Sequence, residues 1–208
     1  MNIKDIYYDV TKIDYEQFKE KYKNKTNDEL LEMLYESSVL IANDKNSSMV
    51  REYATLKECN YTQNTNKLDY DGYNSENIPV EVKPANFYTD NPKSKKLNGH
   101  GSFNDYTWER YDRDYEKNPE VLFSGFVDGK LIFILSVRYR DINGIKEKLE
   151  KRFPNRVRNV GEFLRTIQLS YKNYKDAESL QIKYSDKEKI KKYKKCINKK
   201  LYDKLLSE

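Results

Sequence analysis

The amino-acid sequence predicts an α/β domain in which a central mixed β-sheet is flanked by helices. Residues 26–61 carry apolar side chains at helical spacing. Residues 77–84 and 121–139 contain apolar runs bounded by turn-forming residues, a pattern typical of strands. The 208-residue chain contains 19 tyrosines and 8 phenylalanines, which is more than disordered chains carry. We therefore expect one domain over residues 1–208, with a helical part at 1–62 and a sheet core at 63–185.

The N-terminal part begins with a polar, tyrosine-rich stretch in which we expect a short helix within residues 1–25. Thr26 or Asn27 is expected to cap a helix that extends to about Asn43, and Ser47 or Ser48 to cap another. The apolar side chains that give these two helices one apolar face are Leu30, Leu31, Leu34 and Val39, followed by Met49, Tyr53, Leu56 and Cys59 or Tyr61.

The sheet core is predicted from several short strands. Two lie near 66–72 and 77–84, and the clearest hairpin joins 121–126 to 131–139 through Asp128-Gly129. A helix near 142–152 precedes Pro154, and further strands are expected at 166–171 and 180–184. Residues 85–118 have little apolar periodicity, so they are interpreted as a long functional loop with a short helix around 107–115.

The last segment, residues 186–208, carries a net charge of +5, equal to that of the whole chain. Its apolar residues are spaced three or four apart, which predicts one packed helix with a lysine-rich outer face. They are Ile190, Tyr193, Ile197, Leu201 and Leu205. The alternative is a helix that faces phosphates and adds non-specific affinity for nucleic acid.

Composition excludes several classes of protein. Cys59 and Cys196 lack metal-ligand spacing and suit a reducing compartment. With His100 as its single histidine, the chain is neither a zinc finger nor a nuclease built on histidine pairs. The longest clean apolar run is 131–135, so we expect no signal peptide, no membrane span and a cytoplasmic location.

The most informative pattern is Asp71 followed, ten positions on, by Glu81-Val82-Lys83. A turn over residues 74–77 would place Asp71 opposite Glu81 in a hairpin, with side chains about 5 Å apart. Glu81 and Lys83 would share one strand face. Two carboxylates so close repel each other unless a cation lies between them, and oxygen ligands favour Mg²⁺. The lysine would orient a water molecule or stabilise charge at a phosphate.

This pattern resembles the catalytic signature of the PD-(D/E)XK nuclease superfamily, which includes most type II restriction endonucleases. Asp71, Glu81 and Lys83 match it, while Tyr70 stands where the family often has proline. The stretches 99–105 and 122–133 are also similar to restriction-type nucleases.

The resemblance implies a restriction-endonuclease-like core and Mg²⁺-dependent hydrolysis of double-stranded DNA, leaving a 5′-phosphate and a 3′-hydroxyl. Asp71 and Glu81 would hold the metal together with the Val82 carbonyl, and Lys83 would position the attacking water. Glu52 resembles an additional glutamate that such nucleases place near the metal, although an exposed helix glutamate is an equal alternative. Asp69 is the alternative metal ligand, because it would share a strand face with Asp71.

Hydrogen-bond donors suited to phosphates or base edges concentrate in the expected loop and after the second hairpin. The candidate DNA contacts are Lys93, Lys95, Lys96, His100, Asn104, Arg110, Arg138 and Arg140, of which the last two would share one strand face. Arg156 and Arg158 are either further contacts or solvated surface residues. Trp108 is interpreted as a core or hinge anchor.

Other interpretations stay open at this point. Glu81 and Lys83 also fit a solvated sheet face, with Asp71 as a turn residue. The chain could be a non-catalytic nucleic-acid-binding module, or a repair, homing or phage nuclease of the same fold. A bacterial or phage restriction enzyme with a palindromic target would act as a homodimer and be paired with a methyltransferase for the same site.

Overall fold

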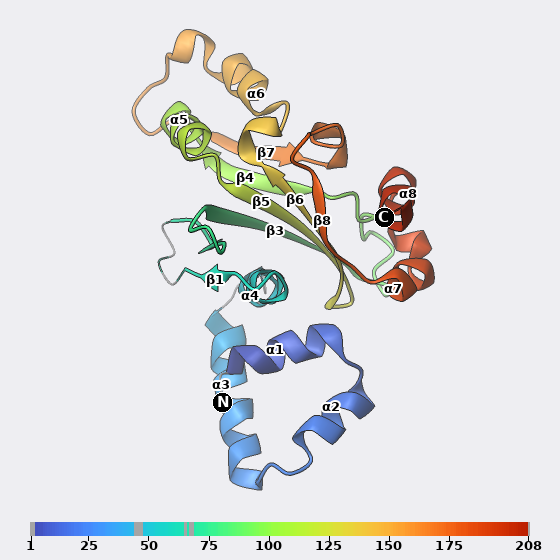
Figure 1. The fold of residues 1–208 in the computed structure, drawn as a ribbon. Coiled ribbons are helices and arrows are strands. Elements are labelled where there is room, and N and C mark those ends of the chain that lie inside the picture. Colours follow the sequence, from blue (N-terminus) through green and yellow to red (C-terminus); the bar gives the residue numbers. More distant parts are fainter. Residues whose placement is uncertain (1–2, 44–47, 65, 67–68, 208) are drawn as a thin grey trace.

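The computed structural model describes residues 3–43, 48–64, 66 and 69–207. Within these residues, six strands form a central sheet in the order β1-β2-β3-β5-β6-β8, and β4 and β7 form a separate two-stranded ribbon (Figure 1). The strands are β1 (Thr62–Gln63), β2 (Gly72–Tyr73), β3 (Pro79–Phe87), β4 (Gly101–Tyr106), β5 (Glu120–Val127), β6 (Lys130–Arg138), β7 (Leu164–Leu169) and β8 (Gln181–Ser185). β3 and β5 are parallel and the other pairs are antiparallel, so the predicted mixed sheet is confirmed.

Helices flank this sheet, as expected. They are α1 (Ile3–Lys12), α2 (Tyr15–Tyr22), α3 (Asn27–Asn43), α4 (Ser48–Glu58), α5 (Trp108–Lys117), α6 (Ile145–Arg152), α7 (Lys187–Lys192) and α8 (Lys199–Ser207). Short 3₁₀ turns are η1 (Tyr139–Asp141), η2 (Pro154–Arg156), η3 (Tyr171–Asn173) and η4 (Lys194–Cys196). No helix in the described ranges is long and apolar enough to cross a membrane.

The N-terminal part contains two helices where one was predicted before residue 25, because Asp14 and Gln17 form a capping box that starts α2. Thr26 caps α3 as expected: its hydroxyl accepts the Glu29 N–H at 3.2 Å, and the Glu29 carboxylate accepts the Thr26 N–H at 2.9 Å. Ser48 is the first residue of α4 and not its cap, so the position of the helix start is confirmed, while the other expected cap, Ser47, lies outside the described residues.

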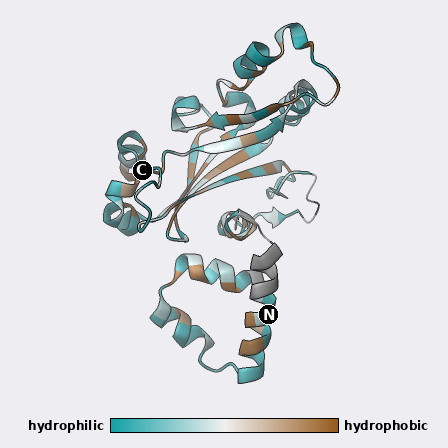
Figure 2. Ribbon diagram, turned by 180° about the vertical axis from the view of Figure 1, so that it is seen from behind, coloured by the Kyte–Doolittle hydropathy of each residue, from teal (hydrophilic) through white to brown (hydrophobic). Residues whose placement is uncertain are grey.

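The apolar face predicted for α3 is not packed into the core. Leu31 and Leu34 are each 63% exposed, and α3 lies away from the sheet (Figures 1 and 2). Leu56 of α4, in contrast, is buried against the sheet together with Ala54. The side chain of Val39 lies outside the described residues. The sheet therefore takes its cover on this side from α4 rather than from α3.

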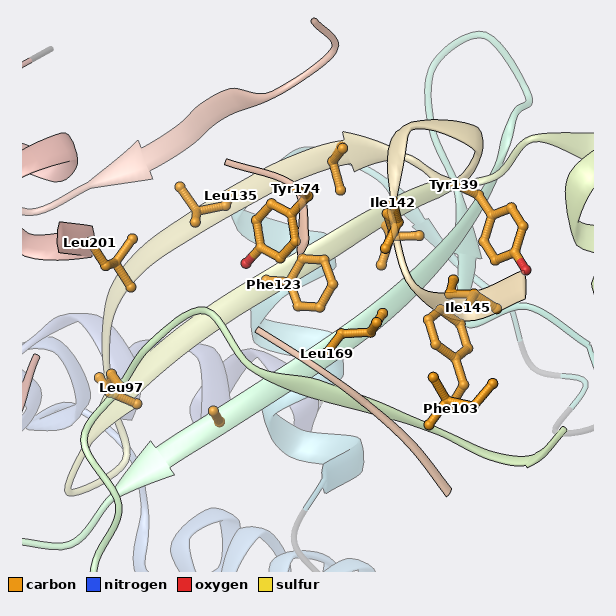
Figure 3. Close-up of a cluster of buried hydrophobic side chains, with 14 of the residues drawn as sticks. Leu97, Phe103, Phe123, Leu135, Tyr139, Ile142, Ile145, Leu169, Tyr174 and Leu201 are labelled. Carbon is orange, nitrogen blue, oxygen red and sulfur yellow. The ribbon is translucent and has the colours of Figure 1, made fainter. Parts of the chain in front are cut away.

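The two faces of the sheet carry two hydrophobic clusters. On β3, Val80 and Val82 belong to the smaller cluster, which packs against α4. The opposite face meets the β4–β7 ribbon and helices α5 to α8 in a larger cluster, where Phe123 stacks on Tyr174 with ring centroids 4.4 Å apart (Figure 3). Since side chains alternate along a strand, Glu81 and Lys83 point to the side of the ribbon.

Residues 85–118 are not the long loop that the sequence predicts. β3 continues to Phe87, and the segment then supplies β4 and α5. Its aromatic residues Phe103, Tyr106 and Trp108 are at most 4% exposed, which supplies the packing that apolar periodicity did not reveal. The expected short helix is confirmed as α5, which is capped by Thr107. The assignment of Trp108 to the core is confirmed as well.

The C-terminal segment packs as predicted but is not one helix. Ile190, Ile197, Leu201 and Leu205 are at most 2% exposed. Between α7 and α8 the backbone leaves the helix to pair with Leu97, whose N–H donates to the Cys196 carbonyl at 2.8 Å and whose carbonyl accepts the Asn198 N–H at 2.7 Å. This long-range pairing replaces the helical hydrogen bonds at that point.

The remaining strand predictions are confirmed with shifted ends. The β5–β6 hairpin turns on Asp128 and Gly129, both with positive φ, as a type I′ turn requires. The strand expected at 166–171 is β7, which pairs with β4, and the one at 180–184 is β8, at the edge of the central sheet. The helix expected near 142–152 is α6.

Candidate active site at the β2–β3 hairpin

The hairpin register places Asp71 next to Glu81, as the sequence predicts. Gly72 pairs with Val80 and Tyr73 with Pro79, so the next position outward sets Asp71 opposite Glu81. The turn is fixed by the Asn74 side chain, which accepts the N–H groups of residues 76 and 78, both at 3.0 Å. Of the first strand, predicted at 66–72, only its end is formed in β2, and residues 67–68 lie outside the described residues.

Asp71 is tied to the neighbouring strand by its side chain. Its Oδ2 accepts the Val82 N–H at 2.7 Å. In a strand, the N–H and C=O of one residue point to the same edge, so the Val82 carbonyl also lies on the Asp71 side. Three oxygen-bearing groups, from Asp71, Glu81 and Val82, therefore gather at this edge of β3.

Glu81 and Lys83 form an ion pair on the opposite face from Val82. Lys83 Nζ lies 2.6 Å from Glu81 Oε1, and their side chains are only 16% and 11% exposed. Arg110 Nη2 lies 3.6 Å from the same oxygen. A solvated sheet face would leave such side chains in water, whereas these are largely withdrawn from it.

The environment of Asp71 opposes its ionisation. Burial, followed by the charge of Glu81, raises the pKa of Asp71 from 3.8 to about 6, and Lys83, the Val82 N–H and Arg110 offset part of this rise. Two carboxylates that share a site repel each other, so one of them retains its proton to a higher pH. A cation bound between them would remove this penalty.

Arg110 reaches the site from the first turn of α5. Its Nη1 donates to the Asn104 carbonyl at 3.0 Å, and its guanidinium lies 5.0 Å from the centre of the Tyr106 ring. Asp114, one helical turn later, lies 3.8 Å from Arg110 Nε. The sequence placed Arg110 among the DNA contacts but gave no sign that it would approach Glu81.

Behind Arg110 lies a buried network that sequence reasoning missed. Asp114 is 2% exposed and accepts hydrogen bonds from the hydroxyls of Tyr70 at 2.8 Å and Tyr106 at 2.6 Å. Arg113 donates to it at 2.8 Å, and the Tyr106 hydroxyl lies 2.8 Å from that of Tyr139. Tyr70 directly precedes Asp71, so this network connects the carboxylate site to α5. The spacing of Arg110 and Asp114 by four residues was the available signal.

Lys83 is covered by β4. A Cβ added to Gly101 would lie 2.5 Å from Lys83 Cβ, so only glycine lets the two strands approach so closely. The Lys83 ammonium lies 4.9 Å from the centre of the Phe103 ring, which limits its movement. Gly101 therefore serves the packing of β4 on β3. Gly99, with φ of +61°, contacts the Tyr174 hydroxyl.

The two additional acidic candidates do not join this pair. Glu52 is half-buried on α4, which packs on the other face of the sheet. Asp69 is exposed and accepts a hydrogen bond from the Tyr73 hydroxyl at 3.3 Å. In the part of the chain that the structure describes, no three His, Cys, Asp or Glu side chains gather into a metal-binding group. Asp71 and Glu81 thus stand as a pair of carboxylates.

The predicted DNA contacts fall into different environments. Lys93, Lys95 and Lys96 are exposed, as is Asn104 on β4. His100 Nδ1 lies 2.7 Å from Asn98 Oδ1, and burial together with Lys95 lowers the pKa of His100. These residues lie before or within β4, so they border the ribbon.

The expected strand arginines do not share a strand. Arg138 ends β6, but Arg140 lies in η1 and donates to the carbonyls of Tyr115 at 2.7 Å and Glu116 at 3.0 Å. Its guanidinium therefore caps the C-terminal end of α5, where cations are favourable. Arg156 pairs with Asp112 at 2.7 Å and Arg158 with Glu109 at 2.9 Å.

Comparisons with known proteins give no family. The chain matches no protein-family model, and no curated protein is significantly similar to it. Its function must therefore be argued from the site. Two adjacent carboxylates, a lysine held beside them and an arginine from α5 form a site that fits a divalent cation and a phosphate group.

Proposed function

We propose that this protein is a metal-dependent endonuclease that hydrolyses phosphodiester bonds of double-stranded DNA, most specifically a type II restriction enzyme. The observation that carries the proposal is the withdrawal of Asp71, Glu81 and Lys83 from water at one hairpin, with the pKa of Asp71 raised to about 6. A merely structural hairpin would gain nothing from holding two acids this close. Asp71, Glu81 and Lys83 are also the three residues that resemble the PD-(D/E)XK signature.

The donor set fits Mg²⁺. Asp71 and Glu81 supply carboxylate oxygens and Val82 a backbone carbonyl, and Mg²⁺ in proteins usually keeps several water molecules besides one or two carboxylates. The mutual repulsion of Asp71 and Glu81 is what a bound divalent cation would relieve. When bound there, the metal would lower the pKa of a water molecule and offset charge on the phosphate.

Each side chain of the site has a role in this chemistry. Lys83, held by Glu81 and covered by β4, would orient the attacking water and accept charge from the phosphate. Arg110 would bind a non-bridging phosphate oxygen, since its guanidinium reaches the same carboxylate from α5. The water oxygen would form a bond to phosphorus while the bond from phosphorus to O3′ breaks. The proton lost by the water would balance the one gained by the 3′-hydroxyl.

The decisive experiment is digestion of plasmid and genomic DNA with Mg²⁺, followed by sequencing of the ends. We expect cleavage at a fixed sequence with 5′-phosphate and 3′-hydroxyl ends, and no cleavage with EDTA. A protein that binds duplex DNA and never cuts it with Mg²⁺ or Mn²⁺ would instead be a binding module. Cutting without a fixed sequence would favour a repair or phage nuclease. For a palindromic target, sedimentation should show a two-fold dimer on the DNA.

The matched variants are Glu81→Ala and Asp69→Ala. Glu81→Ala removes one of the two paired carboxylates and should abolish cleavage while duplex binding persists. Asp69→Ala removes an exposed carboxylate two positions before Asp71 and should cut like the unaltered protein. If Asp69→Ala is inactive and Asp71→Ala is active, the metal ligand has been assigned to the wrong aspartate.

A further inference from the structure

The β4–β7 ribbon presents an outer face of uncharged polar side chains. Its inner residues Phe103 and Ile167 are at most 2% exposed and pack into the core. The register pairs Ser102 with Gln168 and Asn104 with Thr166 on the other face. Asn104, Thr166 and Gln168 are exposed and Ser102 is half-buried. This face therefore carries hydrogen-bonding groups at four adjacent positions, of which Thr166 Oγ1 donates to Asn104 Oδ1 at 3.3 Å.

Positive charge surrounds one end of this face. Ser102 and Gln168 line a groove of about 550 Å³, whose other lining residues include Lys95, Lys96, Lys148 and Lys172. Among the described residues that line the groove, none is acidic. Lys148 comes from α6 and donates to the Gln168 carbonyl at 2.5 Å, so the lysine is fixed beside the ribbon. The groove fits a polyanion.

The ribbon is joined directly to the candidate active site. Gly101 of β4 lies against the Lys83 side chain, and the Asn104 carbonyl accepts a hydrogen bond from Arg110 at 3.0 Å. The candidate active site therefore borders the ribbon, with Lys83 on the packed side of β4. β4 therefore connects the polar pairs, which it forms with β7, to Lys83 on β3 and Arg110 on α5.

We propose that the β4–β7 ribbon lies in the major groove of duplex DNA and reads base edges through Ser102, Asn104, Thr166 and Gln168. The inference rests on the proposed nuclease function and adds the surface that would give it specificity. The major groove admits a two-stranded ribbon, and Asn and Gln pair with adenine through two hydrogen bonds, while Ser and Thr contact several bases. The four lysines of the groove hold the flanking phosphates and carry no sequence information.

The alternative is a solvated ribbon whose polar residues serve only solubility. Exposed edge strands often carry charged side chains, especially lysine, which oppose pairing with another chain. Here the four outward positions are uncharged and the lysines lie at one end of this face, while the exposed charged residues of the two strands, Asp105 and Arg165, lie at the other end. This separation of base-reading and phosphate-binding groups is the pattern expected of a DNA surface.

The test selects bound sequences from duplexes with a randomised centre, with Ca²⁺ in place of Mg²⁺ so that cleavage is not required. We expect the unaltered protein to enrich one short motif. Asn104→Ala and Gln168→Ala should each relax the preference at one position of that motif, by about tenfold. Gln181→Ala, which removes an exposed glutamine from β8, should leave the motif unchanged.

The lysines are tested on the same library and on a duplex of unrelated sequence. Lys148→Ala and Lys172→Ala should weaken binding to every sequence and flatten its salt dependence. Lys151→Ala, an exposed lysine on the same helix as Lys148, should not.

Each outcome decides a separate question. The ribbon proposal is overturned if Asn104→Ala and Gln168→Ala keep the full base preference, or if the unaltered protein enriches no motif. Such results would leave Mg²⁺-dependent cleavage, measured on plasmid DNA, as it stands. Conversely, motif selection that depends on Gln168 in a protein that never cuts DNA would support the ribbon and remove the nuclease. Thermal unfolding of the ribbon variants at the temperature found for Gln181→Ala would show that they fold normally.

Discussion

The β2–β3 hairpin and the C-terminal segment both concentrate charge, but they hold it in opposite ways. In the hairpin, Glu81 and Lys83 are withdrawn from water, and burial raises the pKa of Asp71. In residues 186–208, lysines such as Lys191 and Lys195 stay exposed while the apolar side chains between them are buried. Charge that is left in water has little energetic cost, whereas charge that is buried in like-sign pairs needs a reason.

This difference separates a candidate site from a packed surface element. The C-terminal segment carries the whole net charge of the chain, yet its structure is explained by Ile190, Leu201 and Leu205. The hairpin has few charges, but Asp71 and Glu81 are held together although burial and mutual repulsion oppose their ionisation. Packing alone does not explain this free-energy cost.

The largest expected effect is on the cleavage rate, when one lysine is removed from each of the two regions in turn. Lys83→Ala should reduce the cleavage rate by about 10² or more, because it removes the group that we propose orients water and offsets phosphate charge. Lys191→Ala, which removes an exposed lysine of α7, should leave the rate within about twofold, since exposed charges contribute little. Single-turnover cleavage of a fixed plasmid measures both. Equal effects of the two substitutions would remove the distinction drawn here.

For the free energy of unfolding, the order should be reversed: the change in the C-terminal segment should have the larger effect. Deletion of residues 186–208 removes four side chains that are at most 2% exposed, each of which contributes about 1.5–3 kcal/mol of burial. This sum is comparable to the stability of a typical domain, so the truncated chain should fail to fold cooperatively. Lys83→Ala removes the partner of a largely buried carboxylate, so it should lower the unfolding temperature, but the protein should still unfold cooperatively. A truncated protein that melts normally and loses only DNA affinity would make the segment a phosphate-binding arm.

The features that were predicted correctly from the sequence are those determined by residues close together in the chain. The turn at Asn74 sets the hairpin register, so the approach of Asp71 to Glu81 followed from local pattern. The contact of Arg110 with Glu81 depends on how α5 packs on the sheet, which no local pattern encodes. The same limit applies to the ribbon, because the partner of Asn104 is Thr166, far along the chain.

Two incorrect predictions, the continuous C-terminal helix and the long loop, both concern segments that pair with distant parts of the chain. The continuous helix expected after residue 186 is broken because Ile197 pairs with Leu97, which lies 100 residues earlier in the chain. Part of the segment 85–118, which was expected to be a loop, forms β4 because its backbone pairs with β7. The buried Asp114 network also arises from distant partners, Tyr70 and Tyr139.

That network should support the site without taking part in chemistry. Asp114→Ala would leave the hydroxyls of Tyr70 and Tyr106 and the charge of Arg113 without their acceptor, at a cost of about 3–5 kcal/mol. Asp114→Asn keeps one acceptor oxygen and should recover part of this stability. Urea unfolding measures both, and Asp112→Ala, which removes an exposed aspartate of the same helix, is the control. Asp114→Ala as stable as Asp112→Ala would show that the network contributes nothing.

The smallest effect concerns the pH dependence of the metal-free protein. The pKa of Asp71 is about 6 in the folded state and close to its ordinary value of 3.8 in the unfolded state. Between these values the folded protein binds more protons than the unfolded chain, so the free energy of unfolding should fall as pH rises from about 4 to about 6 and then level off.

Asp71→Asn removes the titrating group and should remove this part of the fall, while Asp69→Asn, an exposed neighbour, should keep it. Mg²⁺ should oppose the fall in the unaltered protein, because a cation between Asp71 and Glu81 stabilises both ionised carboxylates. Urea unfolding at pH values from about 4 to 7, with and without Mg²⁺, measures all three proteins. If Asp71→Asn and the unaltered protein follow the same curve, and Mg²⁺ shifts neither, then burial of the pair carries no energetic cost and the hairpin differs from the C-terminal segment in position alone.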